Sequence, residues 1–373
     1  MLYFEYMKPY LLVLLWMPAF LSAAPLYSPT WDFWLDLPEG YEYAEGNNRD
    51  RYSFQGPHGL KFDIAVYDNV YKDVTQMSRD IERRLGNKGD IAYFKYGDKD
   101  AALMELRFRD SSGWGLCVEL SGKKPGNAPL LLALSYAPEK AAGLDIFHLS
   151  ALDSLAPSEA EKFFPGPIME FSYPRGRYRE MPVAGAAVSA LIREHDAEAA
   201  QAAVDREFAL LCNYQAAPGW QEAWIRFYRA IYRDSRDRVA NAVSQLEQIW
   251  NDGDKRSFAG KALAWIQGFT YERDLSGSDF VNLVSAVTEG RGDCDSRAML
   301  WAMILMQADI PAAIMVSQQY SHAMGLADVA GSGARFNAGG VNWLVAETVA
   351  QVGIGLINQD MSNTDHWLGV LFE

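Results

Sequence analysis

The chain has 373 residues, of which 49% are hydrophobic, and it carries a net charge of −14 at pH 7. The length predicts two or three domains with packed cores. The acidic balance repels phosphate backbones, so we expect no nucleic-acid partner.

Residues 1–24 have the pattern of a secretory signal peptide. Lys8 precedes an apolar run from Leu11 to Ala23, and Ser22 to Ala24 supply the small side chains of a cleavage site. The run is too short to cross a bilayer comfortably, so it does not predict a membrane span. We therefore expect an exported protein, periplasmic or extracellular, that is soluble once the signal peptide is removed.

Residues 28–158 are predicted to form an N-terminal α+β domain around an antiparallel sheet. Val74 to Leu85 has apolar side chains at helical spacing, which indicates an amphipathic helix. The domain carries no catalytic motif, so from its position alone we expect it to recruit a substrate or a protein partner. Strands are indicated by the runs that begin at Asp63, Ala102 and Leu130.

Residues 159–186 are predicted to be a linker, and residues 187–373 to hold a helical collar followed by a catalytic domain. An alanine-rich, charge-laced pattern from Val183 to about Trp250 indicates two or three helices. The linker is predicted from prolines, which interrupt regular structure. These are Pro165, Pro167, Pro174 and Pro182.

The three cysteines cannot all pair, so at least one thiol is free. Cys117 lies in a strand-like run and Cys212 in a helical pattern, and we expect both to be buried as small apolar side chains. Cys294 differs from them in its surroundings, because a glycine-containing turn precedes it and a long apolar run follows it.

Cys294 is predicted to lie in the first turn of a buried helix. The glycines of residues 290–293 allow a tight turn, and Asp293 is the expected N-cap. Residues 298–306 are apolar on nearly every face, which favours a central helix. The positive end of the helix dipole would favour the thiolate, which is the nucleophilic form of the side chain.

Two later strands are predicted to bring an imidazole and a carboxylate together. One strand starts at His322 and the other ends at Glu347. If they pair antiparallel with Val329 near Val341, His322 falls opposite position 348, so Glu347 lies within about one residue of it. The carboxylate would then hold Nδ1 of the imidazole and support its charged form.

These residues resemble those of the transglutaminase-like cysteine peptidase superfamily, over roughly residues 261–357. The similar segments are Gly-Asp-Cys-Asp-Ser-Arg-Ala, Tyr-Ser-His-Ala-Met and Trp-Leu-Val-Ala-Glu-Thr. The resemblance implies a papain-like α+β core in which Cys294 is the nucleophile and His322 is the general base and acid. Glu347 stands where the family commonly has aspartate, and the longer side chain would have to draw back slightly to orient His322.

Three further residues are candidates for the site. Gln267 lies in a segment similar to the one that precedes the family's cysteine turn, and its amide would donate to an oxyanion beside the Cys294 N–H. Tyr320 and Trp343 are candidates for the wall of an acyl pocket.

We expect acyl transfer through a thioester on Cys294, with a peptide or protein amide as substrate. Hydrolysis by a peptidase or amidase is favoured over transfer to an amine, which would crosslink proteins. A non-catalytic binding or scaffold protein that retains the fold is the alternative from another class. No cofactor and no metal are expected, since the chain has no Asp-rich calcium loop and no Cys-x-x-Cys or His-x-x-x-His pair.

Overall fold

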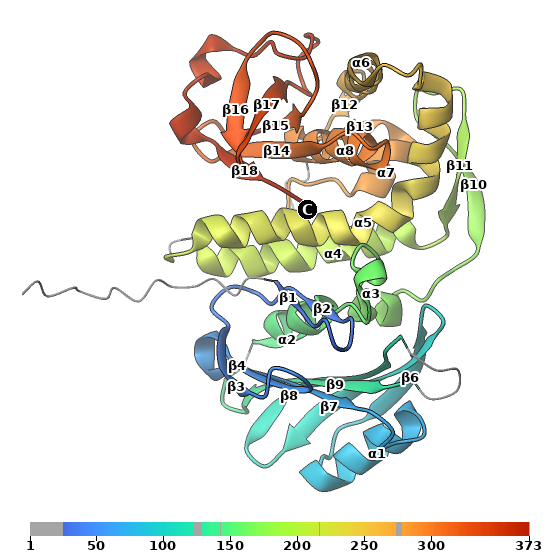
Figure 1. The fold of residues 1–373 in the computed structure, drawn as a ribbon, viewed down its shortest axis with the longest axis vertical. Helices are drawn as coiled ribbons and strands as arrows, with labels where there is room; N and C mark the ends of the chain where they lie inside the picture. Colours follow the sequence, from blue (N-terminus) through green and yellow to red (C-terminus); the bar gives the residue numbers. More distant parts are fainter. Residues whose placement is uncertain (1–24, 122–127, 142, 216, 274–277, 373) are drawn as a thin grey trace, which may run out of the picture.

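The computed structural model describes residues 25–372, apart from 122–127, 142, 216 and 274–277. The predicted signal peptide therefore lies outside the described residues. Figure 1 shows two bodies, each built on a sheet, on either side of a pair of long helices. The combination of helices with largely antiparallel sheets confirms the α+β class.

The N-terminal body is a seven-stranded antiparallel sheet that is covered on both faces. One face packs against α2 (Asp145–Asp153) and the other against α1 (Val74–Leu85), which has the bounds expected from its apolar spacing. In order across the sheet, the strands are β3 (Glu42–Gly46), β4 (Arg51–Gln55), β5 (Lys61–Tyr67), β9 (Leu130–Pro138), β8 (Ser111–Glu119), β7 (Lys99–Phe108) and β6 (Ile91–Tyr96). A short pair, β1 (Leu26–Tyr27) and β2 (Trp34–Leu35), precedes them.

The segment expected to be a linker holds regular structure over much of its length. It contains α3 (Pro167–Ser172) and β10 (Tyr178–Pro182), which pairs with β11 (Ser189–Arg193). Pro167 is compatible with α3 because it lies at the start of the helix, where a backbone N–H has no intrahelical partner. The prolines in this segment therefore mark where helices and strands begin or end, and they do not prevent these elements from forming.

Two helices, α4 (Asp196–Leu211) and α5 (Trp220–Trp250), pack side by side between the two bodies (Figure 1). They form the helical collar expected from the sequence. Cys212 lies just beyond the end of α4 in a single 3₁₀ turn and is exposed, so the expectation that it is buried was wrong. Cys117, in β8, is buried as expected.

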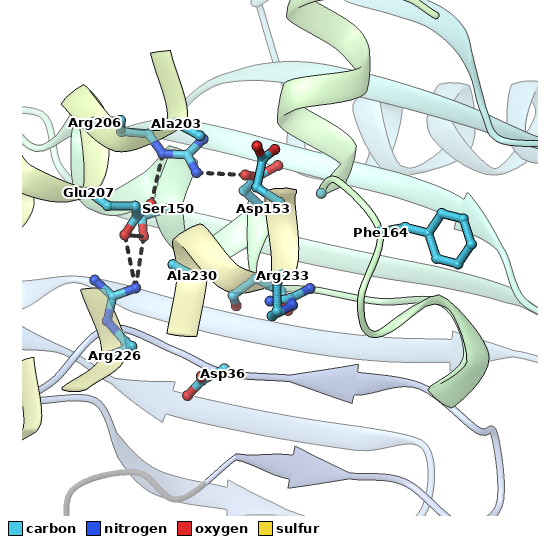
Figure 2. Close-up of a pocket in the computed structure, with 13 residues that line it drawn as sticks. Asp36, Ser150, Asp153, Phe164, Ala203, Arg206, Glu207, Arg226, Ala230 and Arg233 are labelled. Atoms are coloured by element: carbon cyan, nitrogen blue, oxygen red, sulfur yellow. Dashed lines mark hydrogen bonds and ion pairs between the residues drawn. The ribbon is translucent and has the colours of Figure 1, made fainter. Parts of the chain in front are cut away.

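Ion pairs join the collar to the N-terminal body. Arg226 contacts Glu39 at 3.2 Å and Glu207 at 2.9 Å, and Arg206 contacts Asp153 at 2.6 Å. Figure 2 shows several of these groups around a cavity of about 30 Å³. The side chains are largely buried, so each charge depends on its partner for stabilisation.

The C-terminal body is a five-stranded antiparallel sheet with α8 (Cys294–Gln307) packed on one face. Trp301 of α8 lies so close to Gly325 that a Cβ there would come within 2.3 Å of the indole ring, so the strand needs glycine at this point. In order across the sheet, the strands are β16 (Arg335–Ala338), β17 (Val341–Ala346), β15 (His322–Ala327), β14 (Ala312–Ser317) and β18 (Leu368–Val370). The remaining elements are α6 (Lys255–Gln267), α7 (Leu283–Glu289), β12 (Thr270–Tyr271) and β13 (Arg291–Gly292).

Among the residues that the structure describes, no helix combines the length and the hydropathy needed to cross a bilayer.

Candidate active site

Cys294 is the first residue of α8, and local signals place it there. The Asp293 carboxylate accepts a hydrogen bond from the backbone N–H of Ser296 at 2.9 Å, which confirms the expected N-cap. Gly290 ends α7 in the left-handed region with φ 68°, so the chain turns tightly before the cysteine. The Cys294 side chain is buried, with 5% of its surface exposed.

His322 and Glu347 meet at the end of the sheet. The distance from His322 Nε2 to Glu347 Oε2 is 2.8 Å. The register pairs Gly325 with Ala346 and Leu326 with Val345, which is one residue away from the expected pairing. That difference matters, because side chains alternate between the two faces of a strand. In the observed register, both His322 and Glu347 fall on the same face.

The carboxylate holds a different ring nitrogen from the one expected. It bonds Nε2 of His322 and not Nδ1, which leaves Nδ1 as the nitrogen that can exchange a proton with a nucleophile. Glu347 is itself held by the backbone N–H groups of Val349 at 2.7 Å and Ala350 at 3.4 Å. Burial alone would raise the pKa of Glu347, but the hydrogen bond and charge of His322 and these N–H groups together lower it.

The Cys294 sulfur is linked to the residue next to His322. The backbone N–H of Ala323, in β15, donates a hydrogen bond to the sulfur, and the Tyr271 hydroxyl lies within hydrogen-bonding reach of it. The thiol donates to Asp295 Oδ2 at 3.5 Å. The sulfur therefore lies at the start of β15, with its proton directed toward a carboxylate.

The environment of the sulfur does not favour the thiolate. Burial raises the pKa of the Cys294 thiol, and the carboxylates of Asp295 and Asp293 raise it further, while the Ala323 N–H opposes them. Burial and the neighbouring carboxyl groups of Asp295 and Asp293 therefore act against the effect expected from the helix dipole.

Several residues at the site were not singled out from the sequence. Asp295 and Arg297 lie inside the cysteine motif, so the motif itself was a signal for them. Tyr271 follows Gln267 closely in the chain, and the parallel pairing of β12 with β13 places it beside the cysteine turn. Tyr228 gave no local signal, because it comes from α5 and donates to Asp295 Oδ1 from 67 residues away.

Gln267 does not aim its amide at the sulfur. Its Nε2 donates to the backbone carbonyls of Glu347 and Val352, each at 2.8 Å, so both amide hydrogens are engaged. This arrangement revises the oxyanion assignment, since a donor in use elsewhere cannot also stabilise a developing charge. Gln267 instead anchors the turn that carries Glu347.

The two aromatic candidates lie in the same apolar cluster. Trp343 belongs to the apolar cluster on the sheet face that does not pack against α8, and its Nε1 donates to the carbonyl of Ala338. Tyr320 packs against the same cluster, and its ring is 5.4 Å from that of Trp367, which is 6.4 Å from the His322 ring. Tyr320 is thus linked to His322 through the ring of Trp367.

Asp293, Cys294 and Asp295 could in principle hold a metal, since their ligand atoms lie within 4.8 Å of one another. Both carboxylates already have protein partners, however. Asp293 accepts from Ser296, and Asp295 accepts from Tyr228 at 2.5 Å. We therefore derive no metal-dependent step from this cluster.

No family model matches the sequence, and no curated protein matches it. Two solved structures show weak similarity. A crystal structure from Bacteroides thetaiotaomicron is 12% identical, with a TM-score of 0.25, over 56% of this chain and 76% of that one. The Saccharomyces cerevisiae Ran-binding protein Mog1p is 8% identical, with a TM-score of 0.26, over 37% of this chain and 97% of its own. Neither carries an argument about function.

Proposed function

We propose that the protein is a cysteine-dependent acyl-transfer enzyme of the transglutaminase-like type, exported, that hydrolyses peptide or protein amides. The observation that carries the proposal is the His322–Glu347 pair at 2.8 Å, next to a strand residue whose N–H bonds the Cys294 sulfur. An imidazole oriented by a carboxylate beside a thiol at a helix start is the arrangement that nucleophilic catalysis requires.

In the proposed reaction, the sulfur attacks the amide carbon while its proton passes to Nδ1 of His322. The Tyr271 hydroxyl and the Cys294 backbone N–H donate to the oxyanion of the tetrahedral intermediate. As the C–N bond breaks, the imidazolium gives its proton to the departing amine, and a thioester remains. Water then attacks the thioester as His322 takes its proton, which releases a carboxylic acid and restores the thiol.

The raised pKa of the Cys294 thiol and its low exposure favour a second candidate: a non-catalytic binding or scaffold protein that retains the fold. In that case the His322–Glu347 pair stabilises the end of the sheet and does not serve turnover. An enzyme forms a covalent adduct through sulfur, whereas a scaffold forms none.

The test is to incubate the protein with a peptide library and to search by mass spectrometry for acyl adducts on Cys294 and for cleaved amides. We expect both with the wild-type protein, and neither with Cys294→Ser. Cys212→Ser is the matched control, since it removes an exposed thiol away from the site, and its products should equal those of the wild type. Equal products from Cys294→Ser and wild type would remove the nucleophile assignment.

A primary alkylamine added to the same reaction distinguishes hydrolysis from transfer. Hydrolysis predicts free carboxylic acid as the main product at all amine concentrations. Amide products that increase with the amine would instead favour the crosslinking activity.

A further inference from the structure

We propose that Asp295 is a positioning residue that holds the Cys294 proton in the resting state, so that the proton leaves for His322 only during the attack on substrate. The inference rests on the proposed function of the site, but it concerns the thiol and can be measured without a substrate.

The geometry around the thiol supports this role. The thiol donates to Asp295 Oδ2 at 3.5 Å, which is within hydrogen-bonding range for sulfur. Nε2 of His322 is already occupied by Glu347. The carboxylate of Asp295 is therefore the acceptor that the thiol proton has in this structure, whereas the proposed reaction passes that proton to Nδ1 of His322.

Tyr228 fixes the carboxylate in this orientation. Its hydroxyl donates to Asp295 Oδ1 at 2.5 Å, so one oxygen of Asp295 faces a phenol and the other faces the thiol. Tyr228 is 2% exposed and projects from α5, a separate helix that packs against α8. Because two distant segments supply the parts, the contact does not follow from helix geometry alone.

Several titratable groups surround this carboxylate and the sulfur. Asp293, the N-cap of α8, is a second carboxyl group, and burial together with Asp295 raises its pKa well above the ordinary value. Arg297, also on α8, donates from its guanidinium to the backbone carbonyls of Gly292 at 3.0 Å and Phe269 at 2.7 Å. Arg273 also interacts electrostatically with Cys294, while its guanidinium donates to Asp279. Burial lowers the pKa of Arg297, although the neighbouring negative groups oppose that effect. The other elements around the sulfur contribute Tyr228 from α5, Tyr271 from β12, the Ala323 N–H from β15, and the His322–Glu347 pair.

If Cys294 is a thiol in the resting protein, its reactivity should be low. Alkylating agents and oxidants react with the thiolate, so Cys294 should react slowly at neutral pH in the absence of substrate. The exposed Cys212 should react faster. The resting nucleophile would thus be protected, and His322 would act as a general base during attack instead of forming an ion pair with the sulfur beforehand.

The experiment is to measure iodoacetamide labelling of Cys294 as a function of pH, by mass spectrometry, in wild type and Asp295→Asn. The substitution keeps the shape of the side chain and removes its charge. We expect labelling at pH 7 to be about ten-fold faster or more in Asp295→Asn, which corresponds to a fall of about one unit or more in the thiol pKa.

Asp309→Asn is the matched control. Asp309 lies just past the other end of α8, and its left-handed backbone, φ 55°, suits asparagine. Its labelling profile should match that of the wild type.

A folded Asp295→Asn variant with an unchanged labelling profile would overturn the proposal. If the variant does not fold, Tyr228→Phe replaces it, because loss of the phenol removes the group that orients the Asp295 carboxylate. A Cys294 labelling profile that differs from the wild-type profile supports the proposal, and an unchanged profile overturns it. A shifted labelling profile without any turnover would leave Asp295 in this role and remove the enzymatic function.

Discussion

At the scale of single residues, the site depends on how one carboxylate is held. Glu347 uses Oε2 for His322 and Oε1 for the N–H of Val349. The side chain can serve where a shorter aspartate is usual because the turn after β17, anchored by Gln267, carries its backbone to the necessary position. The carboxylate can therefore both orient the imidazole and offset the positive charge that the imidazole gains on taking a proton.

This arrangement predicts an order of activities at position 347. Glu347→Gln keeps the shape of the side chain but removes its charge, so kcat/KM should fall by about 10²-fold or more, because the imidazolium loses its partner. Glu347→Asp retains the charge and should lose less. The measurement is the pH profile of kcat/KM for both variants. Greater loss in the aspartate variant would indicate that Glu347 matters for packing and not for charge.

At the scale of elements, His148 in α2 shows how burial changes the pKa of a side chain. His148 is 4% exposed, and its Nδ1 lies 2.9 Å from the hydroxyl of Ser135 in β9. Burial lowers the pKa of His148 to about 4, while the nearby Asp145 opposes the change. The folded protein thus holds this imidazole neutral where the unfolded chain would protonate it.

The buried His148 should make the folded protein less stable at low pH. The unfolded chain binds the proton near pH 6.5 and the folded protein only near pH 4, so the free energy of unfolding falls as the pH is lowered between these values. The full loss attributable to His148 is about 3 kcal/mol. Urea denaturation of wild type and His148→Gln at about pH 7 and about pH 4.5 should show a steeper decline for wild type. Parallel declines would exclude His148 as the cause.

At the scale of the whole molecule, buried ion pairs join the collar to the N-terminal body, and a partly buried hydrogen bond joins it to the candidate site. Arg226 of α5 contacts Glu39 of the N-terminal body and Glu207 of α4 (Figure 2 shows the latter contact). The same helix carries Tyr228, which holds Asp295 beside the sulfur. The collar thus connects the N-terminal body to the candidate site through neighbouring residues of a single helix.

Removal of this cation should therefore be costly. Arg226→Met leaves Glu39 and Glu207 buried without their shared partner, so the free energy of unfolding at neutral pH should fall by about 3–5 kcal/mol. Lys261→Gln breaks an exposed pair with Asp252 and should cost much less, because water and salt screen that pair. Chemical denaturation followed by circular dichroism compares the two. Similar small losses would show that the junction does not depend on the charge of Arg226.

Local signals in the chain were enough to place the elements whose ends are marked by short-range chemistry. The apolar spacing of α1 and the N-cap at Asp293 act within one turn of helix, so their bounds could be predicted without knowledge of the fold. The same holds for the order in which Cys294, His322 and Glu347 occur along the chain. The hydrogen bonds and charge interactions among these side chains depend on their distances in space, which their order along the chain does not determine.

Tertiary structure alone decided the register of β15 with β17, the ring nitrogen that Glu347 holds and the groups that surround the Cys294 thiol. A shift of one residue moves side chains to the other face of a sheet, and apolar alternation on two neighbouring strands does not choose between such registers with certainty. The thiol depends on burial and on Asp295, which Tyr228 orients from another helix. Desolvation and electrostatic interactions act between residues that are distant in the chain. The sequence could therefore identify Cys294 as the candidate nucleophile but not the groups that shift the pKa of its thiol.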